Sequence, residues 1–97
     1  MKYYDWSDSK NAKLKAERDV CFQDIVGAIN DGRVLQNIAP PNKKRYPNQR
    51  MLVVEFNKYV YLVPYVEDEA KIFFKTIIPS RKATKNHRKD YVEGGKQ

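Results

Sequence analysis

The stretch Ile72–Ala83 joins an apolar strand directly to a basic run, which restricts the folds open to this chain. Residues 72–78 are rich in aromatic and β-branched side chains, which favour a strand inside a sheet. Pro79 is expected to stop that strand, and Ser80 to cap a helix that starts at Arg81. A buried strand that leads into positive charge is typical of a scaffold that presents a binding site.

Lys75 lies in the middle of this expected strand. Strand alternation puts Phe73, Lys75 and Ile77 on one face, so the lysine would interrupt an apolar surface. A buried ammonium group is unfavourable unless water, a carboxylate or a phosphate compensates its charge. Lys75 is therefore a candidate phosphate ligand, and the alternative is a side chain that extends past the sheet rim into water.

Length and charge indicate a small basic domain. Ninety-seven residues suffice for one hydrophobic core, so residues 1–97 are expected to form a single domain with a frayed tail at 93–97. Nineteen Lys and Arg residues against twelve Asp and Glu residues give a formal net charge of +7. Basic surface of this density favours a polyanion, either nucleic acid or an acidic protein.

The sequence contains one cysteine, Cys21, and one histidine, His87. A single cysteine cannot form a disulfide within the chain, which favours a reducing compartment, and no set of metal ligands surrounds His87. No apolar run approaches the length of a membrane span, and the first residues lack a signal-peptide core. We therefore expect a cytoplasmic protein with no cofactor, no metal and no membrane partner.

The N-terminal third is expected to hold two helices. An aromatic segment, Tyr3–Trp6, fits a brief edge strand before a helix over residues 8–18, with Ser7 or Asp8 as its N-cap. Residues 22–29 carry apolar side chains at i, i+3, i+4 and i+7, which predicts an amphipathic helix that belongs to the core.

The middle of the chain is expected to form three strands. Residues 33–38 form the first, and residues 51–56 and 59–66 form two more, joined by the two-residue turn Asn57-Lys58. Pro64 lies in the third strand and implies an edge position or a bulge there. Tyrosines of that strand would serve either in packing or in stacking on a nucleobase, and those considered for stacking are Tyr61 and Tyr65.

A polar loop and a C-terminal helix carry most of the remaining positive charge. The basic and aromatic loop residues are Lys44, Arg45, Tyr46 and Arg50. Cations beside an aromatic ring suit single-stranded nucleic acid, although an ordinary solvated connection is the alternative. On the expected helix, Arg81, Lys85 and Arg88 recur at i, i+4 and i+7 and share a face. His87 and Tyr91 lie on another face, where the histidine is either a proton-transfer group or an ordinary surface residue.

These elements predict an α+β domain with two N-terminal helices, a mainly antiparallel sheet of four to five strands and a basic C-terminal helix. Several stretches resemble the BrnT family of ribonuclease toxins, which belong to type II toxin–antitoxin pairs and have a RelE-like fold. The resemblance spans about residues 3–91 and rests on Trp6, Lys10-Asn11, Val20–Asp24, Leu52–Glu55 and Ile77–Ala83. Its most specific part is the Ile-Ile-x-Ser-Arg-x-Ala ending.

The sequence departs from the family pattern over residues 17–22. The family usually has Lys-His-Gly-Val-Ser-Phe where this chain has Glu-Arg-Asp-Val-Cys-Phe. Asp19 can take the left-handed conformation that the family's glycine supplies. The family's later pair of an arginine and an aromatic residue is matched by Arg45-Tyr46, at a shorter distance from the next strand.

The resemblance implies a toxin that cleaves RNA without a metal ion and inhibits translation. Such cleavage uses the 2′-hydroxyl as nucleophile and needs a proton acceptor, a proton donor and cations on the phosphate. The implied catalytic residues are Arg81, Lys75, Arg45, His87 and Tyr91, with Glu55 as a weaker candidate base. The implied RNA-binding residues are Lys44, Arg50, Arg88 and Tyr46.

The implied partners are a cognate antitoxin, RNA that is free or ribosome-bound, and DNA only through the antitoxin. Two other interpretations stay open. The chain is either a module that binds RNA or an acidic protein without cleavage, or an interaction protein that joins its antitoxin in a repressor complex on DNA.

Overall fold

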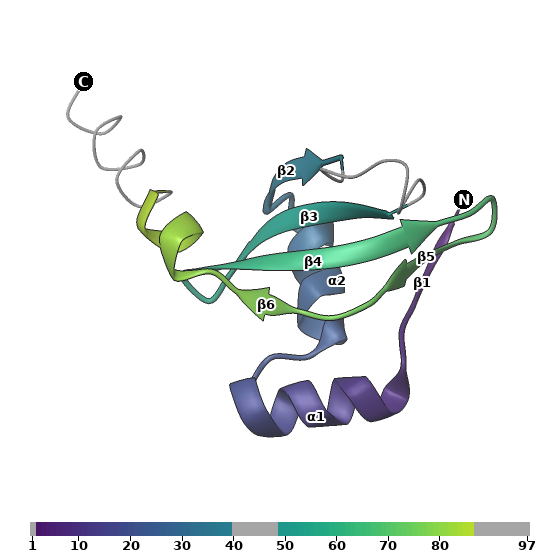
Figure 1. Cartoon of the computed structure of the whole chain (residues 1–97), viewed down its shortest axis with the longest axis horizontal. Coiled ribbons are helices and arrows are strands. Elements are labelled where there is room, and N and C mark those ends of the chain that lie inside the picture. Colours follow the sequence, from purple (N-terminus) through teal and green to yellow (C-terminus); the bar gives the residue numbers. More distant parts are fainter. Residues whose placement is uncertain (1, 40–48, 87–97) are drawn as a thin grey trace.

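The computed structural model describes residues 2–39 and 49–86 (Figure 1). In chain order the elements are β1 Tyr3–Asp5, α1 Asp8–Arg18, α2 Phe22–Asn30, β2 Val34–Ile38, β3 Gln49–Phe56, β4 Tyr59–Glu67, β5 Lys71–Phe74 and β6 Ile78–Pro79. A helical segment over residues 81–86 closes the described part. Helices and sheet form one α+β unit, which confirms the predicted fold class. No helix in the two described ranges is long and apolar enough to cross a membrane.

The sheet has six strands in the order β1-β5-β4-β3-β2, and β6 pairs with β4 beyond β5. Its pairs are antiparallel except that β1 runs parallel to β5, with Tyr3 beside Lys71. The short segment at the N-terminus joins the sheet as the expected edge strand. The sheet exceeds the expected four to five strands because the last expected strand is split into β5 and β6.

The expected continuous strand over residues 72–78 is wrong. β5 ends at Phe74, three residues without strand structure follow, and Pro79 lies inside β6 instead of stopping a strand. Phe74 and Ile77 are both 0% exposed in the core, although alternation put them on opposite faces. The interruption shifts the parity by one residue, and it leaves Lys75 exposed instead of on an apolar face.

Pro64 explains where this interruption falls. The strand that contains it, β4, is central and not at an edge, because it pairs with β3 on one side and with β5 and β6 on the other. The N–H of Lys75 donates to the carbonyl of Pro64 at 2.8 Å, so the backbone of Pro64 faces the gap between β5 and β6. A proline has no N–H with which to bond a neighbouring strand. The strand structure beside β4 is accordingly interrupted at Pro64, between β5 and β6.

The turn between β3 and β4 confirms the predicted hairpin. Asn57 and Lys58 have φ values of 54° and 65°. Positive φ at both central residues defines a type I′ turn, whose twist matches that of the flanking strands. The register then places Glu55 opposite Val60 and Arg50 opposite Tyr65.

The helix ends also follow the sequence. The hydroxyl of Ser7 accepts a hydrogen bond from the N–H of Lys10 at 3.3 Å, which confirms Ser7 as the N-cap of α1. Asp19 ends α1 with a φ of 55°, the left-handed conformation expected of it. At the start of α2 the carboxylate of Asp24 accepts from the N–H of Cys21 at 3.1 Å. Asp24 at N3 thus makes the capping-box bond to the N-cap backbone, even though a cysteine occupies the N-cap.

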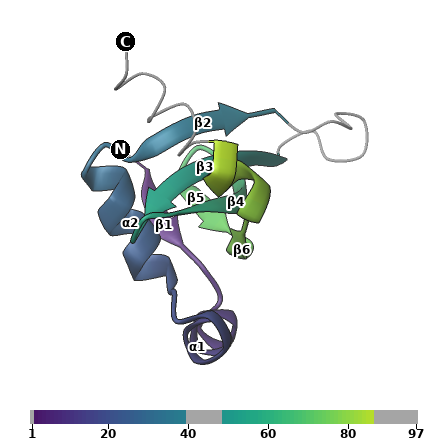
Figure 2. The same cartoon turned by 90° about the vertical axis from the view of Figure 1, so that its left-hand side faces the viewer.

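The core lies between the helices and one face of the sheet, and α2 runs along that face (Figure 2). Phe22 and Phe74 are fully buried, with ring centroids 6.0 Å apart. Trp6 stacks on Phe22 at 5.6 Å, and Tyr4 stacks on Phe74 at 5.3 Å. The prediction that Trp6 packs in the structure as an anchor is confirmed, and these rings join β1, α2 and β5.

Candidate nucleic-acid interface

The helical segment 81–86 is fastened to β4 by one side chain. The hydroxyl of Thr84 accepts from the N–H of Val60 at 2.8 Å and donates to the carbonyl of Ser80 at 2.7 Å. The N–H of Ser80 in turn donates to the carbonyl of Val60 at 3.0 Å. Thr84 is only 5% exposed, so these bonds are shielded from water. The start of the segment is thereby fixed relative to the sheet.

Three cations extend from this fixed segment. The hydroxyl of Ser80 accepts from the N–H of Ala83 at 3.1 Å, which confirms Ser80 as the N-cap. Arg81, Lys82 and Lys85 are exposed, and none of them has an ion-pair partner within residues 2–39 and 49–86. Positive charge without a partner is therefore concentrated at the end of the sheet where the β3–β4 turn also lies (Figure 1).

Lys75 lies beside β4 as well, in the interruption between β5 and β6. Its backbone is bonded to Pro64, whereas that of Ser80 is bonded to Val60, four residues away on β4. At about 3.3 Å per residue, the two attachment points are about 13 Å apart. Lys75 and Arg81 therefore follow one side of β4 and outline a track rather than a single point.

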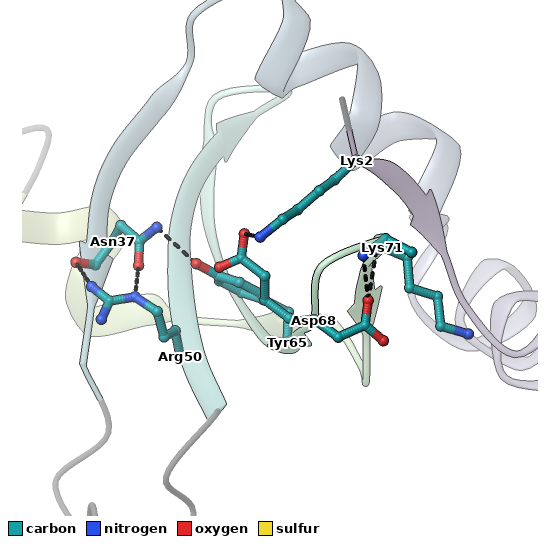
Figure 3. A network of polar contacts seen from close by, with 8 residues as sticks. Lys2, Asn37, Arg50, Tyr65, Asp68 and Lys71 are labelled. Atoms are coloured by element: carbon teal, nitrogen blue, oxygen red, sulfur yellow. Dashed lines mark hydrogen bonds and ion pairs between the residues drawn. The ribbon is translucent and has the colours of Figure 1, made fainter.

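Arg50 lies on the other side of β4 and has a defined orientation. Its Nε donates to Oδ1 of Asn37 at 2.7 Å, and the amide nitrogen of Asn37 donates to the hydroxyl of Tyr65 at 2.8 Å (Figure 3). The guanidinium is thus directed toward β2, away from Lys75. Asn37 was not identified from the sequence, because its role depends on the β2–β3 register, which no local pattern reveals.

The tyrosines of β4 have different environments. Tyr65 is 3% exposed and packs in the core, so its ring cannot stack on a nucleobase. Tyr61 is half-buried, with Tyr59 at 5.5 Å and Phe56 at 6.5 Å between ring centroids. Burial, followed by the neighbouring Tyr59 hydroxyl, raises the pKa of Tyr61 above its ordinary value. Tyr61 has packing contacts with two aromatic rings, and its stacking on a nucleobase stays a prediction.

Glu55 is the candidate base that the structure describes. It lies opposite Val60, the residue to which Thr84 is bonded, so only β4 lies between Glu55 and the helical segment. Arg33 Nη1 approaches its carboxylate at 3.5 Å. The sheet thus brings a carboxylate close to the start of the basic helical segment.

The cations at the far edge of the sheet are neutralised. Lys2 pairs with Glu67 at 2.7 Å, and Lys71 pairs with Asp5 at 3.2 Å, which raises the pKa of Lys71. Asp68 accepts two backbone hydrogen bonds in the β4–β5 turn, and these bonds hold its pKa below the ordinary value (Figure 3). These contacts stabilise the edge and leave no excess charge for a ligand.

Several expected site residues lie outside the described ranges, namely Lys44, Arg45, Tyr46, His87, Arg88 and Tyr91. The expected tail at 93–97 lies outside them as well. Of the implied catalytic and RNA-binding residues, the structure therefore describes Lys75, Arg81, Arg50 and the weaker candidate base Glu55. No group of three or more His, Cys, Asp or Glu side chains in the described part could hold a metal ion.

Comparison with protein-family models, with curated proteins and with solved structures found no match for this chain. A functional assignment therefore rests on the residues and their geometry.

Proposed function

We propose that the chain is the toxin of a type II toxin–antitoxin pair, with a RelE-like, BrnT-like fold, and that it cleaves RNA without a metal ion. The observation that carries the proposal is the Thr84 anchor, which fixes to the central strand a segment with three exposed cations that have no ion-pair partner among the described residues. Two helices ahead of a mainly antiparallel sheet, followed by a basic helical segment, fit the same proposal.

In this proposal Arg81 binds the scissile phosphate, because a planar guanidinium can bond two phosphate oxygens at once. Lys75 holds the RNA farther along β4, and Arg50 contacts it on the other side of that strand, toward β2. Glu55 takes the proton of the 2′-hydroxyl, and His87, Tyr91 and Arg45 remain the other proposed catalytic residues. Stabilisation of charge on the phosphate would supply the largest share of the rate enhancement.

A non-catalytic RNA-binding module is the second candidate function. The observation in its favour is that the carboxylate of Glu55 is already engaged by Arg33. A carboxylate that is paired with a guanidinium is less available to contact the 2′-hydroxyl. In either case the proposed partners are RNA, free or ribosome-bound, and a cytoplasmic antitoxin whose acidic or amphipathic segment covers the basic surface and connects it to DNA.

Expression of the chain without a partner tests the toxin proposal. We expect wild-type expression to arrest growth, and Lys75→Ala combined with Arg81→Ala to relieve the arrest, because the variant loses the cation on the scissile phosphate and a second cation that holds the RNA along β4. Colony counts after induction measure the effect, and a thermal melt checks that the double variant is folded.

The matched control is Lys10→Ala combined with Lys13→Ala, which removes the same charge from α1. This control should remain toxic. Full toxicity of the folded Lys75→Ala/Arg81→Ala variant would contradict the catalytic proposal. RNA that is bound by the purified protein but never cut would favour the binding module instead.

A further inference from the structure

A cleft of about 550 Å³ lies between α2, the start of β2 and the β3–β4 turn. Residues of α2 and of that turn both line the cleft. The cleft is within the size range of small-ligand sites in proteins. The lining residues that are relevant to ligand recognition are Asp24, Gly27, Asp31, Arg33, Phe56 and Lys58.

Gly27 is the most informative of these residues. It lies inside α2, where glycine lowers helix stability relative to alanine, and its φ is not in the left-handed region. A Cβ at this position would meet nothing within 4 Å. Neither backbone geometry nor packing therefore requires a glycine. Its effect is to keep the floor of the cleft open, because any larger side chain would extend into it.

An aromatic wall and carboxylates surround this floor. Phe56 is half-buried, and its ring is supported by Tyr61 at 6.5 Å, so it offers a fixed flat face. Asp24 is held in place by its bond to the N–H of Cys21. Asp31 follows the end of α2 and is exposed. An aromatic face with acceptor groups at its margin suits a flat ligand that carries N–H donors.

Two cations flank the entrance. The N–H of Arg33 donates to the carbonyl of Ala28 at 2.9 Å, and its own carbonyl accepts from Glu55 at 3.0 Å, so the backbone of Arg33 is bonded to both α2 and β3. Its side chain is 54% exposed. Lys58 stands across the cleft on the turn. Cations at the mouth and carboxylates inside suit a ligand with an anionic backbone and a donor-bearing base.

We propose that this cleft binds one unstacked guanine base of single-stranded RNA. The inference rests on the proposed RNA-directed function and adds a specificity site to it. Guanine presents its N1–H and its N2 amino group side by side, so one carboxylate can accept from both. The other three bases present no two adjacent donors on that edge. Phe56 would stack on the base, and Arg33 and Lys58 would bind the flanking phosphates.

Fluorescence anisotropy tests the proposal with 2′-O-methyl oligonucleotides, which lack the hydroxyl needed for cleavage. The first probe carries a single guanine among adenines and uracils. The second probe is identical except that inosine, which lacks the N2 amino group, replaces that guanosine. Wild type is expected to bind the guanine probe about tenfold more tightly, as one good bidentate contact allows. Gly27→Leu, which fills the cleft with a strong helix former, should bind both probes equally and melt no lower than wild type.

Asn30→Leu is the matched control, because it adds the same side chain to α2 outside the cleft lining and should keep the guanine preference. Asp31→Asn is the second test, and it should reduce the preference without removing binding.

A Gly27→Leu protein that still prefers guanine would overturn the cleft proposal while leaving RNA binding intact. Wild type that binds neither probe would instead overturn the proposed function. A third outcome would assign the cleft to a protein partner instead. In that case wild type shows no base preference but binds an arginine-rich peptide, and Gly27→Leu no longer binds that peptide.

Discussion

Thr84 shows how one side chain can position a charged surface. A threonine inside a basic run looks like an ordinary helix residue, since nothing in the sequence marks the N–H of Val60 as its partner. The exposed residues Arg81 and Lys85 were identified from charge and spacing alone. Their attachment to β4 could not be, because it depends on a contact between residues 24 positions apart.

Replacement of this threonine tests the anchor. Thr84→Val keeps the shape but leaves the buried N–H of Val60 without an acceptor, which is expected to lower the free energy of unfolding by about 1–3 kcal/mol. Urea denaturation measures the change, and hydrogen exchange at Val60 should accelerate. Thr76→Val is the control, since no hydrogen bond of the Thr76 side chain occurs within the described residues. Equal stability of the two variants would show that the anchor is unimportant.

At the level of elements, local signals predicted what local interactions determine. The bounds of α1 follow from the Ser7 cap and the left-handed Asp19, and the hairpin follows from Asn57-Lys58. The prediction of one continuous strand over residues 72–78 was wrong because it depends on Pro64 in β4. Pro64 has no backbone N–H, which a continuous neighbouring strand would need as a hydrogen-bond donor. The break is further held by Arg18, whose guanidinium donates to the carbonyl of Ile77 at 2.6 Å.

The β4–β5 turn gives a prediction about pH. Backbone hydrogen bonds from Lys71 and Ala70 lower the pKa of Asp68 in the folded protein, so the folded state binds fewer protons in acid than the unfolded chain. The resulting stabilisation is complete above the ordinary aspartate pKa and is lost as pH falls through the lowered value. We expect Asp68→Asn to flatten the decline of Tm between about pH 5 and pH 2. Parallel decline in both proteins would contradict this.

For the whole molecule, the distribution of charge matters more than the total of +7. Cations at the β1 edge are paired with carboxylates, whereas those after β6 are exposed without partners in the described part. Composition predicted a polyanion partner, but it could not reveal this asymmetry, which arises from β1 and β5 lying together.

Salt dependence of RNA binding checks the asymmetry. Replacing Arg81, Lys82 and Lys85 by Ala should reduce the slope of log K against log salt by about 2, because each phosphate contact to single strands contributes about 0.7. The control replaces three ion-paired lysines, Lys2, Lys15 and Lys71, and changes the net charge equally. Similar slopes for the two triple variants would mean that RNA binding depends on the total charge and not on where the charge lies.

The parallel pairing of β1 with β5 also affects when the molecule can work. Tyr3 meets Lys71 across 68 positions of the chain, so the first strand emerges from the ribosome long before its neighbour exists. The basic segment and its anchor come later still. The complete sheet and the anchored basic segment therefore form only after β5 and Thr84 have been synthesised.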